Sequence, residues 1–362
     1  MIKNSVKFIL VIFIIILISL YFDYQKFLNT PLNINASFIF TIDSGSSFKD
    51  LNKKIESYHI LNKPYYFEFY ARHTGYAKKI QSGEYQLSPG LTPTEIINMF
   101  VSGNVVQYSI TLVEGWTYSD IFAEIYSNKI LVKKLKYSSQ EAVCKSLKSP
   151  DHYGTHFRRS HPDFDIHSCK TELRPYPEIR VGYNVDGLFF PDTYYFTRGA
   201  SDIEILDRAH SRLVNILEME WETRDIDLPY KDSYEALIMA SIIEKETALA
   251  AERSKISGVF VRRLKNNMKL QTDPTVIYAM GEKYDGNIRK KDLNINSSYN
   301  TYRYKGLPPT PIALAGREAI HAALHPENDD ALYFVAKKDG SHYFSKTLDE
   351  HNEAVQKYQL NK

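Results

Sequence analysis

The chain has 362 residues, of which 43% are hydrophobic, and a formal net charge of +2. This length allows one large domain or two modest ones with a buried core. The small net charge gives no electrostatic bias towards nucleic acid or any other polyanion. Aromatic residues make up 13% of the chain, with tyrosine the most frequent. Tyrosine occurs both on surfaces that stack against sugars and in hydrophobic cores, so the composition alone does not distinguish a carbohydrate-binding protein from any other.

An apolar segment, Phe8–Phe22, follows Lys3 and Lys7 at the N-terminus. It is shorter than the ~20 residues that comfortably cross a bilayer. No small-x-small cleavage site follows it, however, and Tyr21 and Tyr24 suit a membrane interface. We therefore predict an uncleaved transmembrane anchor over residues 1–24, with the N-terminus in the cytoplasm and the remainder outside. The alternative, a buried helix of a soluble domain, conflicts with the lack of a polar face.

Residues 25–36 are predicted to be a linker, and residues 37–114 a small α+β module. Ser44–Ser47 supplies a turn and a helix N-cap, and Pro93 stands in the first turn of a helix. The size and order of the elements resemble a LysM-like glycan-binding unit. The expected elements are a strand at Ser37–Ile42, helices at Phe48–Tyr58 and Pro64–His73, a strand at Gly83–Leu87, a helix at Thr94–Ser102 and a strand at Gln107–Val113.

Residues 115–180 are predicted to be a connecting region that carries an insertion. Its two cysteines, Cys144 and Cys169, could form a disulfide outside the membrane, but the sequence leaves their state open. The spacing of the four histidines between them matches no standard metal-ligand pattern, so we expect no metal site and no cofactor. Ser149–Arg180, rich in proline, histidine and charge, is expected to be a loop. The histidines are His152, His156, His161 and His167.

Residues 181–360 are predicted to form a second, larger α+β domain, so the fold class of the whole chain is α+β. Its aromatic stretch Gly187–Phe196 is followed by alternating helices and loops. The expected elements are helices at Ile203–Glu218, Ser233–Ala251, Arg253–Asn266 and Gly316–Leu324, a turn at Asp273-Pro274, a proline-rich loop at Tyr299–Pro311, and a hairpin of Leu332–Ala336 with His342–Phe344.

Glu246, in the predicted helix Ser233–Ala251, is a candidate general acid. Its neighbours at helical spacing are strongly apolar, whereas those of Glu244 are smaller and more mixed. A carboxyl group on an apolar surface is desolvated, which raises its pKa into the range that suits a general acid near neutral pH. The alternative is an ion pair to a nearby base or to a residue of another element. The apolar neighbours of Glu246 are Met239, Ile242, Ile243, Leu249 and Ala250, and the candidate bases are Lys245 and Arg253.

Several ordered motifs resemble the endolytic murein transglycosylases, the MltG or YceG-like family. The resemblance covers the anchor, the small module and nearly the whole C-terminal half, and departs from the family over Lys134–Arg180. The motifs are Ala240–Thr247, Val259–Leu264, Leu270–Tyr278, Tyr299–Tyr302, Gly306–Pro309, Gly187–Tyr194, and Leu332–Ala336 to His351-Asn352.

The resemblance implies cleavage of the β-1,4 bond between N-acetylmuramic acid and N-acetylglucosamine without water, at a lysozyme-like helical site. In similar enzymes the catalytic Glu precedes a small hydroxyl residue, and here only Glu246-Thr247 has that form. Ordinary glycosidases pair two carboxyl groups. A lytic transglycosylase uses the 6-hydroxyl of muramic acid as the nucleophile, so one Glu suffices and the product is a 1,6-anhydro end.

The remaining candidates are substrate-binding residues, each with turn or core packing as its alternative. They are Glu244, Gln271, Asp273, Tyr299, Asn300 and Tyr302. The expected partners are peptidoglycan strands, the membrane and peptidoglycan synthases, with the catalytic domain in the periplasm at the bacterial inner membrane. Two other functions stay open: a lysozyme-type hydrolase that recruits Asp273 or Asp192, and a non-catalytic wall-binding scaffold.

Overall fold

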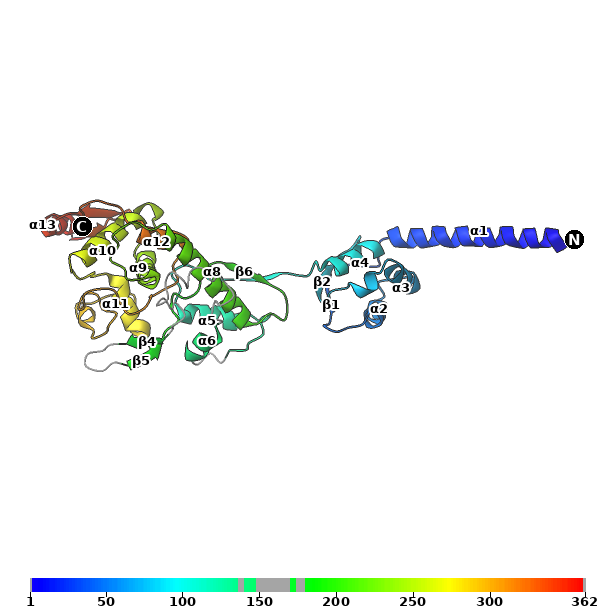
Figure 1. Cartoon of the computed structure of the whole chain (residues 1–362), viewed down its shortest axis with the longest axis horizontal. Helices are drawn as coiled ribbons and strands as arrows, with labels where there is room; N and C mark the ends of the chain where they lie inside the picture. Colours follow the sequence, from blue (N-terminus) through cyan, green and yellow to red (C-terminus); the bar gives the residue numbers. More distant parts are fainter. Residues whose placement is uncertain (1, 136–139, 148–169, 174–179, 361–362) are drawn as a thin grey trace. The chain divides into compact units, whose positions relative to one another are not determined.

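A computed structural model describes residues 2–135, 140–147, 170–173 and 180–360 (Figure 1). The chain divides into two units. The first comprises residues 1–108 with 195–199, and the second comprises residues 109–194 with 200–362. The division falls within two strands that pair with each other, β3 (Tyr108–Thr111) and β6 (Thr193–Phe196). The predicted module boundary at residue 114 therefore lies a few residues beyond the division between the units.

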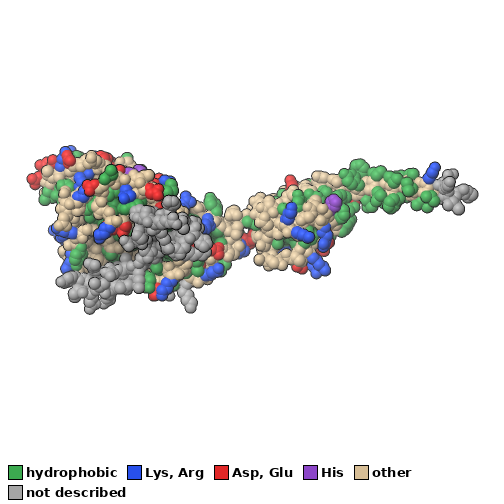
Figure 2. Space-filling model, in the orientation of Figure 1, with side chains coloured by type: hydrophobic (Ala, Val, Ile, Leu, Met, Phe, Trp, Pro, Cys, Tyr) green, Lys and Arg blue, Asp and Glu red, His purple; other side chains and the backbone are tan. Residues whose placement is uncertain are grey.

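The N-terminal helix α1 (Ile2–Asn29) is longer than the predicted apolar segment. Within Val6–Asn29 the most apolar stretch has a mean hydropathy of 2.5 and is not buried by the rest of the chain. Figure 2 shows hydrophobic side chains covering most of its length. These properties fit a single-pass membrane anchor.

Residues 25–36, predicted to be a linker, are part of the first unit. They are helical up to Asn29. The side chains of Phe27, Leu28, Leu32 and Ile34 are buried in the core of that unit. The reason is their apolar character: a segment that carries four large apolar side chains gains more from burial than from exposure to water.

The remainder of the first unit packs three helices on a two-stranded antiparallel sheet. Strand β1 pairs with β2 in a register that sets Phe38 opposite Leu87. Capping boxes begin the helices at Ser47 and Thr92, as their sequences predict. Five of the six predicted elements lie here: β1 (Phe38–Ile42), α2 (Phe48–Ser57), α3 (Pro64–His73), β2 (Gly83–Leu87) and α4 (Pro93–Ser102), with a short 3-10 turn η1 (Tyr76–Lys78) after α3. The sixth, predicted at Gln107–Val113, is the strand β3.

The second unit begins with helices α5 (Tyr118–Ser127) and α6 (Gln140–Ser146). Strands β4 (Lys170–Leu173) and β5 (Arg180–Tyr183) then pair antiparallel. The prediction of a loop over Ser149–Arg180 is therefore wrong for Lys170–Leu173 and for Arg180, the first residue of β5. Cys169 and the four histidines of the predicted insertion lie outside the described residues.

The core of the second unit is built around α9 (Ser233–Glu246), which packs against α8, α10, α11 and α12. The middle of α9 is buried without interruption from Ala236 to Ile243. The other elements are α8 (Asp202–Glu222), η3 (Ala250–Glu252), α10 (Arg253–Lys265), α11 (Asp273–Met280), η4 (Gly281–Lys283), η5 (Asp292–Asn294), α12 (Arg317–Leu324), the hairpin β7 (Tyr333–Ala336) and β8 (His342–Ser345), α13 (Leu348–Val355) and a π-helical turn η6 (Gln356–Leu360).

Several boundaries in this unit differ from the predictions, such as the end of α8 at Glu222 instead of Glu218, and two differences have a local cause. Helix α9 ends at Glu246 rather than Ala251, because Thr247 adopts extended backbone (φ −144°, ψ 135°). The Thr247 hydroxyl then accepts a hydrogen bond from the Leu249 amide at 3.0 Å, a local contact that competes with the helix. Asp273-Pro274 starts helix α11 instead of forming a turn, since proline is tolerated in a first helical turn.

Candidate active site

Glu246 is the last residue of α9, so its carboxyl group emerges where a buried helix reaches a cavity. The Asp232 side chain caps the other end by accepting the Glu235 amide at 2.9 Å. Between these ends, apolar side chains fix the helix in the core. The rigid support places the carboxyl group reproducibly at the cavity wall.

The cavity has a volume of about 510 Å³ and is lined by residues of several elements. The end of α9, helix α10, the segment before α11, the β7–β8 hairpin and α13 all contribute. Polar and aromatic side chains dominate: Glu246, Arg263, Gln271, Asp273, Tyr302, Tyr333, Phe334, His342, His351, Asn352 and Gln359. A pocket of this size and composition fits a polar ligand with flat faces, such as sugar rings.

Burial raises the pKa of the Glu246 carboxyl group above its usual range. Negative charge on Asp273 acts in the same direction. The Thr272 hydroxyl opposes it by donating a hydrogen bond to Glu246 Oε2 at 2.6 Å, and His342 and Arg263 also oppose it. Because burial dominates, the carboxyl group keeps its proton to higher pH than an ordinary glutamate.

The prediction that apolar neighbours at helical spacing desolvate Glu246 is correct for some of these residues and wrong for others. Ile242 and Ile243 are fully buried, as the helical spacing requires. Leu249, however, lies beyond the end of α9 and is 40% exposed. Segments distant in sequence, including β7 and α13, line the cavity together with Glu246.

Three of the predicted substrate-binding residues, Gln271, Asp273 and Tyr302, line the cavity beside Glu246. The Tyr302 hydroxyl donates a hydrogen bond to Asp273 Oδ1 at 2.6 Å. Gln271 has left-handed backbone (φ 50°), and its amide donates to the Thr301 carbonyl at 3.2 Å. An unfavourable backbone conformation held in place at a cavity wall is a common property of ligand-binding segments.

The other three predicted residues, Glu244, Tyr299 and Asn300, do not line this cavity. The buried Glu244 carboxylate accepts the Gly316 amide at 2.9 Å, and burial raises its pKa. Asn300 is fully buried and donates to two backbone carbonyls of the preceding loop. The Tyr299 hydroxyl shares a hydrogen bond of 2.7 Å with Thr310. Glu244 and Asn300 therefore fix backbone segments, and Tyr299 is linked to the Thr310 side chain.

The sequence did not single out Arg263 or His342. The Arg263 guanidinium is buried, donates to the Leu332 and Leu270 carbonyls at 2.7 Å each, and lies over the Tyr333 ring. His342 Nδ1 lies 2.7 Å from Glu252 Oε2. Arg263 belongs to the motif Val259–Leu264, and His342 belongs to the predicted hairpin. Only the packing of α10 and β8, however, brings both residues to the cavity that Glu246 lines.

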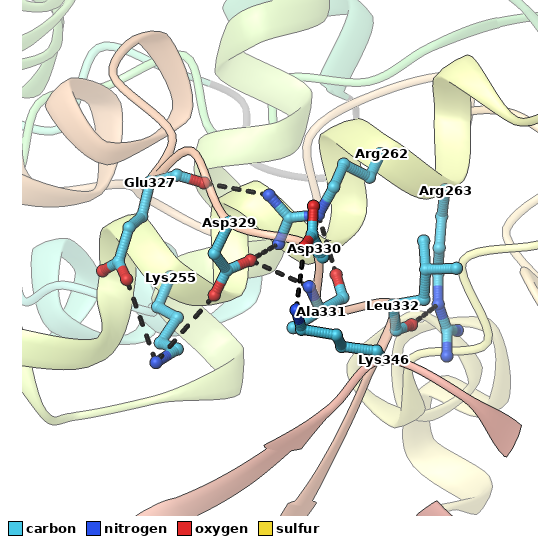
Figure 3. Close-up of polar contacts among 9 residues, drawn as sticks. All are labelled: Lys255, Arg262, Arg263, Glu327, Asp329, Asp330, Ala331, Leu332 and Lys346. Atoms are coloured by element: carbon cyan, nitrogen blue, oxygen red, sulfur yellow. Dashed lines mark hydrogen bonds and ion pairs between the residues drawn. The ribbon is translucent and has the colours of Figure 1, made fainter. Parts of the chain in front are cut away.

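A polar clamp between α10 and the segment before β7 positions the hairpin wall of the cavity (Figure 3). Arg262 donates to the carbonyls of Ala331 at 2.8 Å and Glu327 at 2.9 Å, and pairs with Asp329. Lys346, after β8, pairs with Asp330 at 2.8 Å. The clamp fixes where β7 begins and hence where its side chains meet the cavity.

One described cluster has metal-ligand chemistry, away from the cavity lining. Potential ligand atoms of Glu220, His321 and His325 lie within 4.8 Å of one another. The Glu220 carboxylate already pairs with Arg317 Nε at 2.9 Å and His321 Nδ1 at 2.8 Å. Its charge is thus compensated by protein groups, and the cluster serves as an ion-pair link between α8 and α12.

The fold and the site together define a two-unit α+β protein with an N-terminal apolar helix and a desolvated carboxyl group in a polar, aromatic cavity. Comparison with known proteins identifies the family. The chain belongs to the YceG-like family, whose model matches residues 40–357.

Similar proteins carry consistent names. The chain is 34% identical over 335 residues to the endolytic murein transglycosylase of Bacillus subtilis (strain 168), covering 92% of this chain and 86% of that protein. It is 26% identical to the endolytic murein transglycosylase of Streptococcus pneumoniae (strain ATCC BAA-255 / R6), covering 92% of this chain and 61% of that protein. A crystal structure of a putative yceG-like protein from Listeria monocytogenes superposes with a TM-score of 0.51 and 31% identity, covering 88% of this chain and 98% of that chain.

Proposed function

We propose that this protein is an endolytic peptidoglycan lytic transglycosylase. It cleaves the β-1,4 bond between N-acetylmuramic acid and N-acetylglucosamine within glycan strands and leaves 1,6-anhydro ends. The observation that carries the proposal is the Glu246 carboxyl group, whose pKa burial raises at the wall of a polar, aromatic cavity. The names of the relatives and the family membership support the same reaction.

In the proposed mechanism Glu246 acts twice. As a general acid it donates its proton to the glycosidic oxygen, and the bond from that oxygen to C1 of muramic acid breaks. As a base it then takes the proton of the 6-hydroxyl while O6 forms a bond to C1. The carboxyl group ends protonated as it began, so no water is consumed. The attack is intramolecular and gains from proximity.

Cavity residues would orient the strand around this carboxyl group. Asp273, Gln271 and Tyr302 supply hydrogen-bond partners for hydroxyl and N-acetyl groups, and the Tyr302 ring offers a stacking face. The lysozyme-like character of the site lies in its single helical glutamate. Glu244, predicted to bind substrate, is proposed instead to hold the end of α9 through its contact with Gly316.

A lysozyme-type hydrolase is the second candidate, because Asp273 lines the same cavity as Glu246. Asp192 supports this candidate less, since it pairs with Arg212 at 2.6 Å and does not line the cavity. Mass spectrometry of digested peptidoglycan separates the reactions. Products with 1,6-anhydro ends are expected, and products one water heavier would establish hydrolysis.

The first unit is proposed to be a LysM-like glycan-binding module. The order β1-α2-α3-β2, with the two strands antiparallel, supports this interpretation. A scaffold that only binds the wall would rely on such a module alone. Glycan cleavage by the wild-type protein excludes a pure scaffold, and the absence of any cleavage would favour it.

We further propose that α1 anchors the protein in the bacterial inner membrane, with its N-terminus in the cytoplasm. Lys3 and Lys7 precede the apolar segment, as the positive-inside rule requires. The units that follow would lie in the periplasm, within reach of nascent glycan strands and of peptidoglycan synthases as partners. Accessibility of the C-terminus to protease added outside spheroplasts tests this orientation.

A further inference from the structure

We propose that α3 docks on the same membrane that α1 spans, with Tyr65 and Phe69 inserted where lipid headgroups meet acyl chains. The occupant of this surface is the phospholipid of that bilayer. The inference rests on the proposed anchor and adds to it a second contact, which fixes how the first unit meets the membrane.

The length of the apolar segment is the first argument. Phe8–Phe22 spans about 22 Å at ~1.5 Å per helical residue, whereas the hydrocarbon core of a bilayer is ~30 Å thick. The missing distance corresponds to roughly five further residues. Helix α1 continues without a break to Asn29, and this last part packs against α3. The turn that completes the span therefore brings α3 to the membrane surface.

The negative charge of Asp23 in that turn is neutralised by a residue next to α3. Asp23 follows the apolar segment directly, and a lone carboxylate at this depth would be costly. Lys63 Nζ lies 2.6 Å from Asp23 Oδ1, and the Tyr66 hydroxyl donates to Oδ2 at 3.0 Å. The ion pair joins α1 to the start of α3, so both enter the interface together.

The surface between α1 and α3 is aromatic and exposed. The Tyr24 ring lies 5.4 Å from Tyr66 and 5.6 Å from Phe69, and the two helices enclose an apolar groove of about 680 Å³. Tyr65 and Phe69 are 59% and 56% exposed. Tyrosine favours the membrane interface because its ring is apolar and its hydroxyl remains wet. The face continues the apolar surface of α1, which points to lipid as the occupant.

Depth-dependent fluorescence quenching tests the inference. The full chain is reconstituted, one per nanodisc of phosphatidylcholine and phosphatidylglycerol, with or without bromine on the acyl chains. Phe69→Trp and Tyr65→Trp are the reporters. Ile39→Trp is the matched control, because Ile39 is 42% exposed on β1 of the same unit. The signal of the native Trp116 and Trp221 is subtracted using the wild-type protein.

We expect brominated lipid to quench the reporters at positions 69 and 65 and to leave the control at position 39 unquenched. Ile14→Trp, in the middle of α1, reports on the anchor itself. Quenching at position 14 without quenching at position 69 would overturn the inference while leaving the anchor intact. Loss of quenching at both positions would overturn both. A blue-shifted but unquenched reporter at position 69 would show that protein, not lipid, covers α3.

Discussion

At the scale of single residues, the proposed chemistry depends on the Glu246 carboxyl group. Glu246→Gln keeps the shape of the side chain but can neither donate nor accept the proton. We expect glycan cleavage to fall by roughly 10²–10⁴-fold, the usual contribution of a general acid or base. Glu318→Gln on α12, an exposed glutamate outside the cavity lining, is the control and should keep wild-type activity. Unchanged cleavage by Glu246→Gln would remove this residue from the mechanism.

The Thr272 hydroxyl should set the alkaline limit of activity. Burial raises the pKa of Glu246, and the hydrogen bond from Thr272 opposes that rise by stabilising the ionised form. Thr272→Val removes the bond, so the pKa should rise further. Because the acid must be protonated to act, the alkaline limb of the kcat/KM profile should move to higher pH. Thr275→Val, which loses hydrogen bonds only to Thr272 and Thr301, should leave that limb in place.

The same pKa shift predicts a stability effect. A carboxyl group with a raised pKa in the folded state adds stability below its unfolded pKa and loses it as the pH rises through the folded value. Glu246→Gln has no such loss. Its melting temperature should therefore exceed that of the wild type at neutral pH, and the difference should vanish in acid. A constant difference across the titration would contradict the proposed desolvation.

The candidate site could be predicted from the sequence only where local pattern carries the information. The choice of Glu246 over Glu244 came from apolar spacing and the adjacent Thr247, and the structure places only Glu246 at the cavity. Arg263 and His342 were not predicted as site residues, since their positions depend on tertiary packing of segments far apart in the chain. The catalytic and binding roles stay predictions until the variants are measured.

At the scale of elements, the close packing of α10 on the segment before β7 makes Gly258 sensitive. In a helix interior, alanine is more favourable than glycine by about 1 kcal/mol of folding free energy. A Cβ at position 258, however, would lie 2.4 Å from the Glu327 carbonyl oxygen. The backbone would have to move to relieve this clash. We expect Gly258→Ala to lower the free energy of unfolding by about 1–3 kcal/mol, as other overpacked sites do.

Thermal unfolding of the Gly258→Ala variant measures this effect. Glycan cleavage should also fall, because the polar clamp that positions the β7–β8 hairpin wall lies on the same face of α10. A raised melting temperature would mean that helix propensity outweighs the packing contact. Normal cleavage at a lowered melting temperature would show that the polar clamp does not influence the active site.

Elements with strong local signals were predicted closely. Helix α3 and strand β2 have the predicted bounds, since proline and turn residues mark their ends. The end of α9 was wrong because Thr247 and the contacts around it stop a helix whose sequence would otherwise continue. Strand β3 was predicted as part of the small module, but its partner is β6, which only the tertiary fold could show.

At the scale of the whole molecule, the first unit includes residues that the sequence suggested were a linker. Phe27, Leu28, Leu32 and Ile34 belong to its core. Burial of a large apolar side chain contributes about 1.5–3 kcal/mol, so removing all four costs roughly 6–12 kcal/mol as an upper estimate. That loss is comparable to the entire stability of a small domain.

Two truncated chains test this difference. A chain that begins at Asp23 loses the apolar segment but keeps the four core residues, so its first unit should stay folded. A chain that begins at Ser37 lacks those residues, and its first unit should be unfolded. Hydrogen exchange at the paired strands β1 and β2 reports on the unit directly: protection is expected in the first chain and absent in the second. Equal protection of β1 and β2 in both chains would show that residues 25–36 are a true linker, as the sequence first suggested.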